Sequence, residues 1–273
     1  MQAFSPSPVE SVASLWRNRA LVLALVKREV VGRYRGSVMG IAWSFFNPVL
    51  MLVIYTLVFS VIFKARWGLG SEESKADFAI ILFVGMIVMG VFAECINRAP
   101  NLILENVNYV KKVIFPLEVL PWVALGSALF HAGVSVVVLL AAQLILRHTL
   151  PWTALLFPVV LVPLVLTTVG LAWFLTALGV YVRDIGQATV MLTTIMMFVS
   201  PVFYPVSMLP ERFQGWMQLN PLAYIIEQGR NTLIYGLVPD PLGWIAALAA
   251  GIAIAALGFA WFQRTRRGFA DVL

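Results

Sequence analysis

Residues 242–263 read LGWIAALAAGIAIAALGFAWFQ, a run of 22 residues without a charged side chain. A helix needs about 20 mainly apolar residues to cross the ~30 Å hydrocarbon core of a membrane. Five earlier runs have the same character, at 40–63, 78–97, 116–146, 152–181 and 185–204. Because lipid offers no partner to unpaired backbone groups, each run is expected to be a helix. The sequence therefore predicts an all-α integral membrane protein with six transmembrane helices.

The overall composition supports the same class. Of the 273 residues, 61% are hydrophobic and only 12% are charged, and the mean hydropathy is +0.90. Soluble domains carry ~25% charged residues, and a single soluble core could not bury this much apolar surface. An ordinary cytosolic enzyme is thereby excluded. A membrane β-barrel is excluded because the apolar runs are continuous, and a disulfide framework because Cys95 is the only cysteine.

The distribution of basic residues predicts how the chain is oriented. The first ~15 residues lack the basic start and apolar run of a signal peptide, so the N-terminus is expected to remain in the cytoplasm. With six spans, 13 of the 19 Lys and Arg residues then lie on the cytoplasmic side. The positive-inside rule favours this arrangement, in which both termini are cytoplasmic. The pI of 9.7 therefore indicates orientation in an anionic membrane, and no nucleic-acid partner is expected.

Residues 12–35 have the pattern of an amphipathic helix ahead of the first span. Trp16 and Val26 fall on one face at helical spacing, and Arg28 and Arg35 lie roughly opposite Val26. Aromatic rings at headgroup depth with cations on the wet side are typical of a helix on the membrane surface. The alternative is a soluble helix packed on a partner. Residues 1–35 are thus predicted to be a cytoplasmic segment, and 36–273 a six-helix transmembrane domain.

Two segments outside the spans are too patterned to be free loops. Residues 101–112 (NLILENVNYVKK) are too polar to cross, and a short helix parallel to the membrane is predicted there. It is either a contact for a cytoplasmic partner or a plain connector. Residues 205–241 are apolar and are divided by Asn220 and Pro221 into two amphipathic pieces. A pair of re-entrant or interfacial outer helices is predicted, with an extracellular cap without a transport role as the alternative.

Catalytic and metal-binding patterns are missing from the sequence. Glu94 is an acid near the inner end of a span, and Arg98 stands four residues later, where it can form an ion pair. His131 has no second histidine or nearby carboxylate, so it is expected to be a packing residue and no metal site is predicted. The chain also lacks a GxxxxGK[ST] phosphate loop and the HExxH and GxSxG motifs. The chain is therefore expected to be a conduit whose energy comes from another source.

Aromatic side chains recur along the first span and gather near the outer end of the fifth. A ring offers a flat apolar face to the C–H groups of a sugar, and a tyrosine hydroxyl adds a hydrogen bond. Such rings could line a path for a carbohydrate. Core packing and the interfacial aromatic belt are the alternative for each of them. The candidate path residues are Phe45, Phe46, Tyr55, Phe59, Phe63, Phe198, Phe203 and Tyr204.

Several motifs resemble the permeases of ABC-type polysaccharide exporters, a group that includes O-antigen and teichoic acid exporters. Residues 26–48 (VKREVVGRYRGSVMGIAWSFFNP) resemble that family's basic surface helix and first span, and 109–121 (YVKKVIFPLEVLP) its inner loop. Three later matches follow in the family's order, namely RDIGQ at 183–187, SPVFYP at 200–205 and RRGFADVL at 266–273. Together the matches cover nearly the whole chain.

The resemblance implies a homodimer with two ATP-binding cassette subunits in the bacterial inner membrane. It implies export of an undecaprenyl-diphosphate-linked polysaccharide, most closely an O-antigen, with ATP and Mg bound by the partner and no cofactor in this chain. Residues 206–240 would form gate helices near the exit. Membrane lipids are a further implied partner of the chain. The implied ATPase-coupling residues are Glu105, Asn108, Tyr109, Lys111 and Lys112, and those of the interface helix are Trp16, Arg28, Arg33 and Arg35.

Three alternatives remain open at this stage. A permease of the same architecture could export a teichoic acid or capsular polymer. It could instead export a small drug or a peptide. A membrane-embedded lipid-modifying enzyme is a third class, although the missing acid clusters argue against it.

Overall fold

The computed structural model describes residues 7–62, 75–110, 115–217 and 220–273, in which all regular structure is helical. Within these residues, five helical segments are long and apolar enough to cross a membrane. They confirm five of the predicted spans within a few residues. The principal helices of these spans are α3 (Trp43–Tyr55), α4 (Lys75–Arg98), α6 (Leu120–Arg147), α7 (Phe157–Tyr181) and α11 (Pro241–Thr265). Helix α3 continues as the π-helical turn η2 (Thr56–Ile62).

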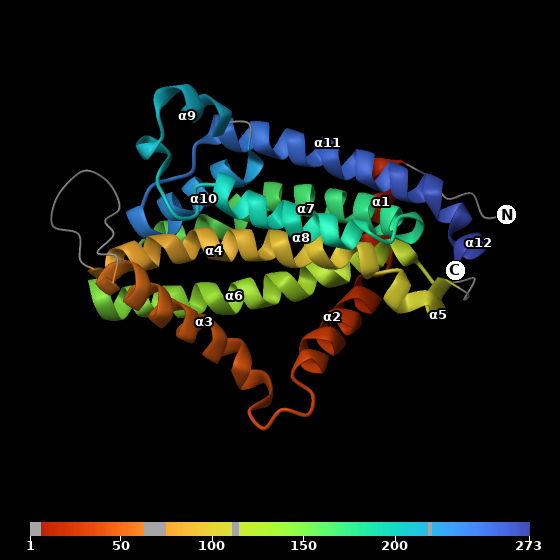
Figure 1. The fold of residues 1–273 in the computed structure, drawn as a ribbon, viewed down its shortest axis with the longest axis horizontal. Coiled ribbons are helices and arrows are strands. Elements are labelled where there is room, and N and C mark those ends of the chain that lie inside the picture. Colours follow the sequence, from red (N-terminus) through yellow and green to blue (C-terminus); the bar gives the residue numbers. More distant parts are fainter. Residues whose placement is uncertain (1–6, 63–74, 111–114, 218–219) are drawn as a thin grey trace.

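Helix α4 forms the centre of the bundle. Ile81, Leu82, Val84 and Val88 on this helix have at most 1% of their surface exposed. Helices α6, α7 and α8 (Ile185–Val199) surround it, whereas α2 (Arg19–Arg33) and α3 lean away and meet at a turn (Figure 1). The first and last described helices, α1 (Pro8–Arg17) and α12 (Phe269–Val272), lie toward one end of the bundle, and α9 (Glu211–Met217) lies at the other (Figure 1).

Helices α7 and α11 pack in parallel through small residues. A Cβ atom on Gly258 would lie 2.0 Å from the carbonyl oxygen of Gly170, and one on Gly251 would lie 3.0 Å from that of Pro163. Helices in lipid associate through close van der Waals packing rather than through the hydrophobic effect. Small residues at Gly251, Ala255 and Gly258 therefore join α11 to α7 within one chain.

The predicted span 185–204 is not one continuous helix. Helix α8 ends at Val199 and Ser200 is extended (φ −76°, ψ 152°), because Pro201 disfavours helical geometry in the residue before it. Fifteen residues span about 22 Å, less than the ~30 Å hydrocarbon core. Helix α8 is therefore too short to be counted with the five membrane-length helices.

The N-terminal segment is two helices rather than one. Helix α1 (Pro8–Arg17) ends at Asn18, whose side-chain nitrogen donates to the Ser14 carbonyl at 2.8 Å, and α2 begins at Arg19. This local bond competes with continued helix formation. The prediction of one continuous helix over 12–35 was therefore wrong, because the segment is divided at Asn18.

The predicted helix over 101–112 is also divided. It consists of η3 (Ala99–Asn101), η4 (Leu104–Asn106) and the one-turn helix α5 (Val107–Val110), and 111–112 lie outside the described residues. The Asn106 side chain donates to the Leu102 carbonyl at 2.9 Å and offers the backbone an alternative to a regular helix.

The outer segment contains the two predicted pieces. Helix α9 is exposed, whereas α10 (Pro221–Arg230) is packed against α4 and α7, and the Asn220 side chain caps its start by accepting from Leu222 N at 3.0 Å. The π-helical turn η8 (Asn231–Tyr235) follows and ends at Gly236 (φ 71°). The remaining short elements are η1 (Gly40–Ala42), η5 (Leu117–Val119), η6 (Trp152–Leu156), η7 (Val206–Met208), η9 (Arg266–Gly268) and α12 (Phe269–Val272).

Candidate functional site

Four of the predicted aromatic residues form a continuous chain of rings. Tyr55 on α3 and Phe59 on η2 have ring centroids 6.4 Å apart, and Phe59 stacks on Phe203 at 6.0 Å. Phe203 in turn stacks on Phe198 of α8 at 5.7 Å. Phe198 is 60% exposed, while Tyr55, Phe59 and Phe203 are half-buried. The chain of rings thus joins the first span to the segment that follows α8.

The other predicted path residues lie apart from this chain. Phe45 and Phe46 are exposed near the start of α3, where Phe46 meets Trp43 edge to face at 5.9 Å. The Tyr204 hydroxyl donates to the carbonyls of Phe198 and Val199, both at 3.0 Å. It thereby supplies a hydrogen-bond donor to carbonyl groups at the end of α8 that have no partner within the helix. Phe63 lies outside the described residues.

A cavity of about 270 Å³ opens between α3, α4, α6 and the end of α2. Its apolar part includes Tyr55, which also belongs to the aromatic chain, so the cavity and the rings adjoin. The polar lining residues are Arg33, Tyr34, Ser44, Asn47, Glu94, His131 and Ser135. The cavity therefore offers hydrogen-bonding groups next to ring faces, the combination that a carbohydrate requires.

Alternating charges connect α2 to α4 beside the cavity. Glu94 accepts from Arg33, and its predicted pairing with Arg98 is confirmed at 3.9 Å. Arg98 donates to Glu29 at 2.6 Å. Two cations and two anions offset one another, which lets charged groups lie close to the membrane interior. Sequence spacing predicted the Glu94–Arg98 pair, but the partners on α2 are more than 60 residues away in the chain.

His131 and Tyr34 form the polar wall of the cavity. Their rings meet edge to face at 6.0 Å, and the Tyr34 hydroxyl lies 3.5 Å from His131 Nδ1. Among the described residues, His131 Nε2 is buried without a hydrogen-bond partner. Partial burial raises the pKa of Tyr34 above its ordinary value, so its hydroxyl stays protonated and able to donate at neutral pH. His131 thus packs against Tyr34, and the hydrogen bond expected for its second ring nitrogen is not found among the described residues.

The described coupling candidates, on η4 and α5, lie at the end of the bundle that holds α12 (Figure 1). Glu105 and Asn108 are exposed, whereas the Tyr109 ring stacks on Phe115 with centroids 4.2 Å apart. Arg28 of the predicted interface helix donates to the Tyr109 hydroxyl at 3.2 Å, so this helix and the inner loop are in contact. Lys111 and Lys112 lie outside the described residues.

The remaining interface-helix candidates face outward. Trp16 is 70% exposed, and the Arg19 guanidinium lies 4.6 Å from its ring centroid. Arg35 is exposed. Neither residue lines the cavity, so of the four candidates only Arg33 does.

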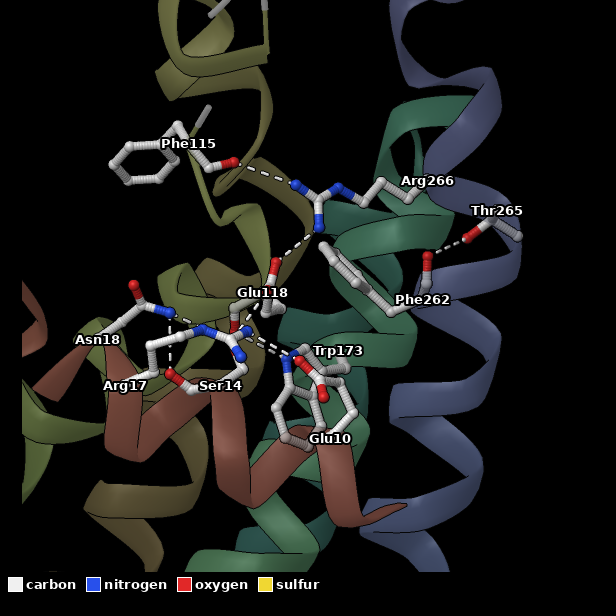
Figure 2. A network of polar contacts seen from close by, with 10 residues as sticks. All are labelled: Glu10, Ser14, Arg17, Asn18, Phe115, Glu118, Trp173, Phe262, Thr265 and Arg266. Atoms are coloured by element: carbon white, nitrogen blue, oxygen red, sulfur yellow. Dashed lines mark hydrogen bonds and ion pairs between the residues drawn. The ribbon is translucent and has the colours of Figure 1, made fainter. Parts of the chain in front are cut away.

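A buried polar network at the same end of the molecule was not predicted from the sequence. Figure 2 shows Arg266 reaching toward Glu118, whose carboxylate accepts from Arg266 at 2.6 Å and from the Ser14 hydroxyl at 2.8 Å. Arg266 also donates to the Phe115 carbonyl at 3.0 Å, and Trp173 Nε1 to the Glu118 carbonyl at 3.0 Å. The network joins α1, the start of the third span, α7 and the end of α11.

Arg230 connects the outer helices to the bundle. Its side chain is 4% exposed and donates to the carbonyls of Ile81 at 3.2 Å and Val202 at 2.9 Å. A buried cation held by carbonyl oxygens fixes α10 against α4 and against the segment after α8.

The geometry of the described residues fits a conduit. They contain no group of three or more His, Cys, Asp or Glu side chains that could hold a metal ion. The distinctive features are a half-polar cavity that leads to a chain of rings and a network at the inner loop. These features suit passage of a molecule through the bundle.

Comparisons with known proteins also indicate a transport protein. The sequence profile of the ABC-2 type transporter family matches residues 20–234. The chain is 27% identical to the O-antigen export system permease protein RfbA of Myxococcus xanthus, over 96% of this chain and 99% of that protein. Identity to RfbA of Klebsiella pneumoniae is 24%, over 93% and 95%. Identity to the polysialic acid transport protein KpsM of Escherichia coli is 20%, over 81% and 84%.

Proposed function

Because this chain belongs to the ABC-2 type transporter family, we propose that it is the membrane subunit of an exporter that moves lipid-linked polysaccharide across the bacterial inner membrane. The proposed cargo is an O-antigen carried on undecaprenyl diphosphate. The observation that carries this proposal is the similarity to an O-antigen export permease over 96% of this chain and 99% of the relative. The match therefore includes the N-terminal helices, the inner loop and the outer helices.

The proposed topology has six crossings and both termini in the cytoplasm. Helix α8 and the outer segment after it would together make the fifth crossing, with α9 and α10 as gate helices near the exit. The packing of α10 against α4 and α7 supports a position within the membrane, because irregular backbone at that depth must be surrounded by protein. The bundle end that holds Arg264, Arg266 and Arg267 would face the cytoplasm, as the positive-inside rule favours.

The proposed assembly is a homodimer with two ATP-binding cassette subunits, which would bind ATP and Mg. Glu105, Asn108, Tyr109, Lys111 and Lys112 are the proposed contacts for those subunits. The apolar exposed faces of α3 and α8 support a second copy of the chain as a neighbour. Large exposed side chains on these faces include Val49, Leu50, Val53, Met191, Leu192 and Ile195.

The proposed path begins at the cavity beside α3 and continues along the aromatic chain. Hydroxyl and amide groups such as Tyr34 and Asn47 would bind sugar hydroxyls at the polar end. Tyr55, Phe59 and Phe203 would then present ring faces with little directional preference, so a polymer could slide along them. A capsular polymer is the second candidate cargo, supported by 25% identity to the capsule polysaccharide export inner-membrane protein CtrC of Neisseria meningitidis over 80% of this chain.

The proposal is tested by deleting the gene in its own host and restoring it. Deletion should leave lipid-linked polymer inside the cell, and the restored chain should return the polymer to the surface. The purified chain should also capture an ATPase subunit whose hydrolysis rises in lipid vesicles. Altered drug tolerance with normal surface polymer would contradict a polysaccharide cargo, and nucleotide hydrolysis by the chain alone would contradict a separate ATPase.

A further inference from the structure

A groove runs along the outside of the α7–α11 pair. The helices touch at Gly170 and Gly258, where neither residue carries a side chain, and this close approach leaves a hollow flanked by larger neighbours. The hollow has a volume of about 430 Å³. The residues that line it are Gly170, Leu171, Phe174, Ile254, Leu257, Gly258, Ala260, Trp261 and Arg264.

One end of the groove is cationic and the rest is apolar. Arg264 is the only charged residue in the lining, and Trp261 beside it lies 5.5 Å from the Phe174 ring, centroid to centroid. In the described part of the chain the Arg264 guanidinium has no ion pair or side-chain hydrogen bond, nor does the Trp261 ring nitrogen. Both donors are therefore available to a ligand at the end of an apolar channel.

The length of the groove matches one leaflet of a bilayer. Ile254 and Arg264 are ten positions apart on α11, which corresponds to about 15 Å along the helix axis. One leaflet contributes about half of the ~30 Å hydrocarbon core. An acyl chain in the groove would thus place its headgroup beside Arg264 and Trp261, the side chains that are typical of the membrane interface.

We infer that this groove binds an anionic phospholipid of the surrounding membrane, with one acyl chain along α7 and α11 and the headgroup phosphate on Arg264. Basic pockets between membrane helices on the cytoplasmic side have the chemistry that binds anionic headgroups. The assignment of the groove to the cytoplasmic leaflet rests on the topology in the proposed function. The binding of an anionic lipid rests only on the shape and charge of the groove.

A phospholipid fits the groove better than the other apolar occupants. The polyisoprenoid chain of the carrier lipid is much longer than one leaflet, whereas the groove ends near the bilayer midplane. A second copy of the chain would present an apolar helix and would offer no anionic partner to the Arg264 guanidinium. A phosphate beside Arg264 satisfies the cation directly.

The full chain is purified in detergent and titrated with phosphatidylglycerol or with phosphatidylcholine of identical acyl chains. The test compares how much of each lipid the chain retains. Native mass spectrometry should show preferential binding of phosphatidylglycerol. An interfacial cation contributes ~1 kcal/mol to such binding, so R264Q should weaken it about fivefold. A260L, which fills the groove, should weaken binding of both lipids. The control R267Q removes an exposed cation outside the groove and should leave binding unchanged.

Three results would overturn the inference. Equal binding of the two lipids, or unchanged phosphatidylglycerol binding in R264Q, would remove the role of Arg264. Loss of the oligomer in A260L without a change in lipid binding would identify the occupant as a second copy of the chain. Lipid retention is measured without polysaccharide, so failure of export would test the proposed function and leave this result standing.

Discussion

The most deeply buried ion pair couples three segments that are far apart in the sequence. Glu118 and Arg266 have side chains only 10% exposed and lie 2.6 Å apart, with Ser14 as a further donor. A buried carboxylate is stable only when its partners remain, because the protein interior solvates charge poorly. This network is therefore expected to hold α1, the inner loop and the chain's end as a unit.

Replacing Glu118 with Ala should destabilise the folded chain strongly. The substitution leaves Arg266 buried without its partner, which typically costs about 3–5 kcal/mol. Thermal unfolding of the purified chain in detergent measures the effect. Glu10→Ala is the matched control, because it removes an ion pair with Arg17 whose side chains are 34% and 62% exposed, and it should change little. Equal effects of the two substitutions would contradict a special role for the buried pair.

Replacing Tyr55 or Phe59 with Ala should reduce polymer export without lowering the amount of chain in the membrane. A ring contact contributes about 0.5–1.5 kcal/mol beyond its buried area, so export is expected to fall roughly two- to tenfold. Tyr55→Phe keeps the ring and is the control, with export close to that of the parent. Surface polymer and membrane abundance are measured together. A parallel loss of both would indicate that these rings serve packing instead.

At the residue scale, spacing predicted only interactions that are local in the sequence. Glu94 and Arg98 are four residues apart on one helix, so their pairing followed from helical geometry. Glu118 gave no such signal, because its partners are 104 and 148 residues away. Only the fold shows which aromatic candidates contact one another, because the sequence does not indicate which partner an apolar ring packs against.

At the scale of elements, hydropathy predicted the long helices and failed where a short polar motif interrupts them. Five membrane-length helices lie close to their predicted ranges, because the mean hydropathy of a long window stays high even where single polar side chains occur. The interruptions at Asn18, Ser200 and Asn106 arise from local bonds or from a following proline. Such features alter one or two backbone angles without changing the average hydropathy.

The crossing of α7 and α11 should not tolerate a side chain at Gly258. An added methyl group would lie 2.0 Å from the Gly170 carbonyl oxygen, so the helices would have to separate. Overpacking of this kind costs about 1–3 kcal/mol or more. Gly258→Ala should therefore lower the unfolding temperature in detergent, whereas Gly133→Ala, with nothing within 4 Å of its Cβ position, should not. Similar unfolding temperatures would show that α7 and α11 are not held in this register.

At the scale of the whole molecule, the two ends of the bundle have different tasks in the proposed exporter. One end gathers α1, α5 and α12 (Figure 1), and the Glu118 network joins α1 to η5 and η9 there (Figure 2). The other end holds α9, α10 and the aromatic chain. Helix α4, with the cavity on one side and Arg230 against its Ile81 carbonyl, extends between them. A displacement of the inner loop by an ATPase would therefore act on the same packed bundle that positions the outer helices.

This polarity predicts which engineered cysteines are accessible from which side of the membrane. The native Cys95 is 1% exposed, so the parent chain should react little with a membrane-impermeant maleimide. Val9→Cys on α1 and Val272→Cys on α12 change exposed residues at one end of the bundle, and Glu211→Cys changes an exposed residue on α9 at the other end (Figure 1). In intact cells only the α9 cysteine should be labelled, and permeabilised cells should label all three. The terminal cysteines must behave alike, because an odd number of crossings would place them on opposite sides. Labelling of just one terminal cysteine in intact cells would rule out six crossings, and labelling of both without α9 would reverse the orientation.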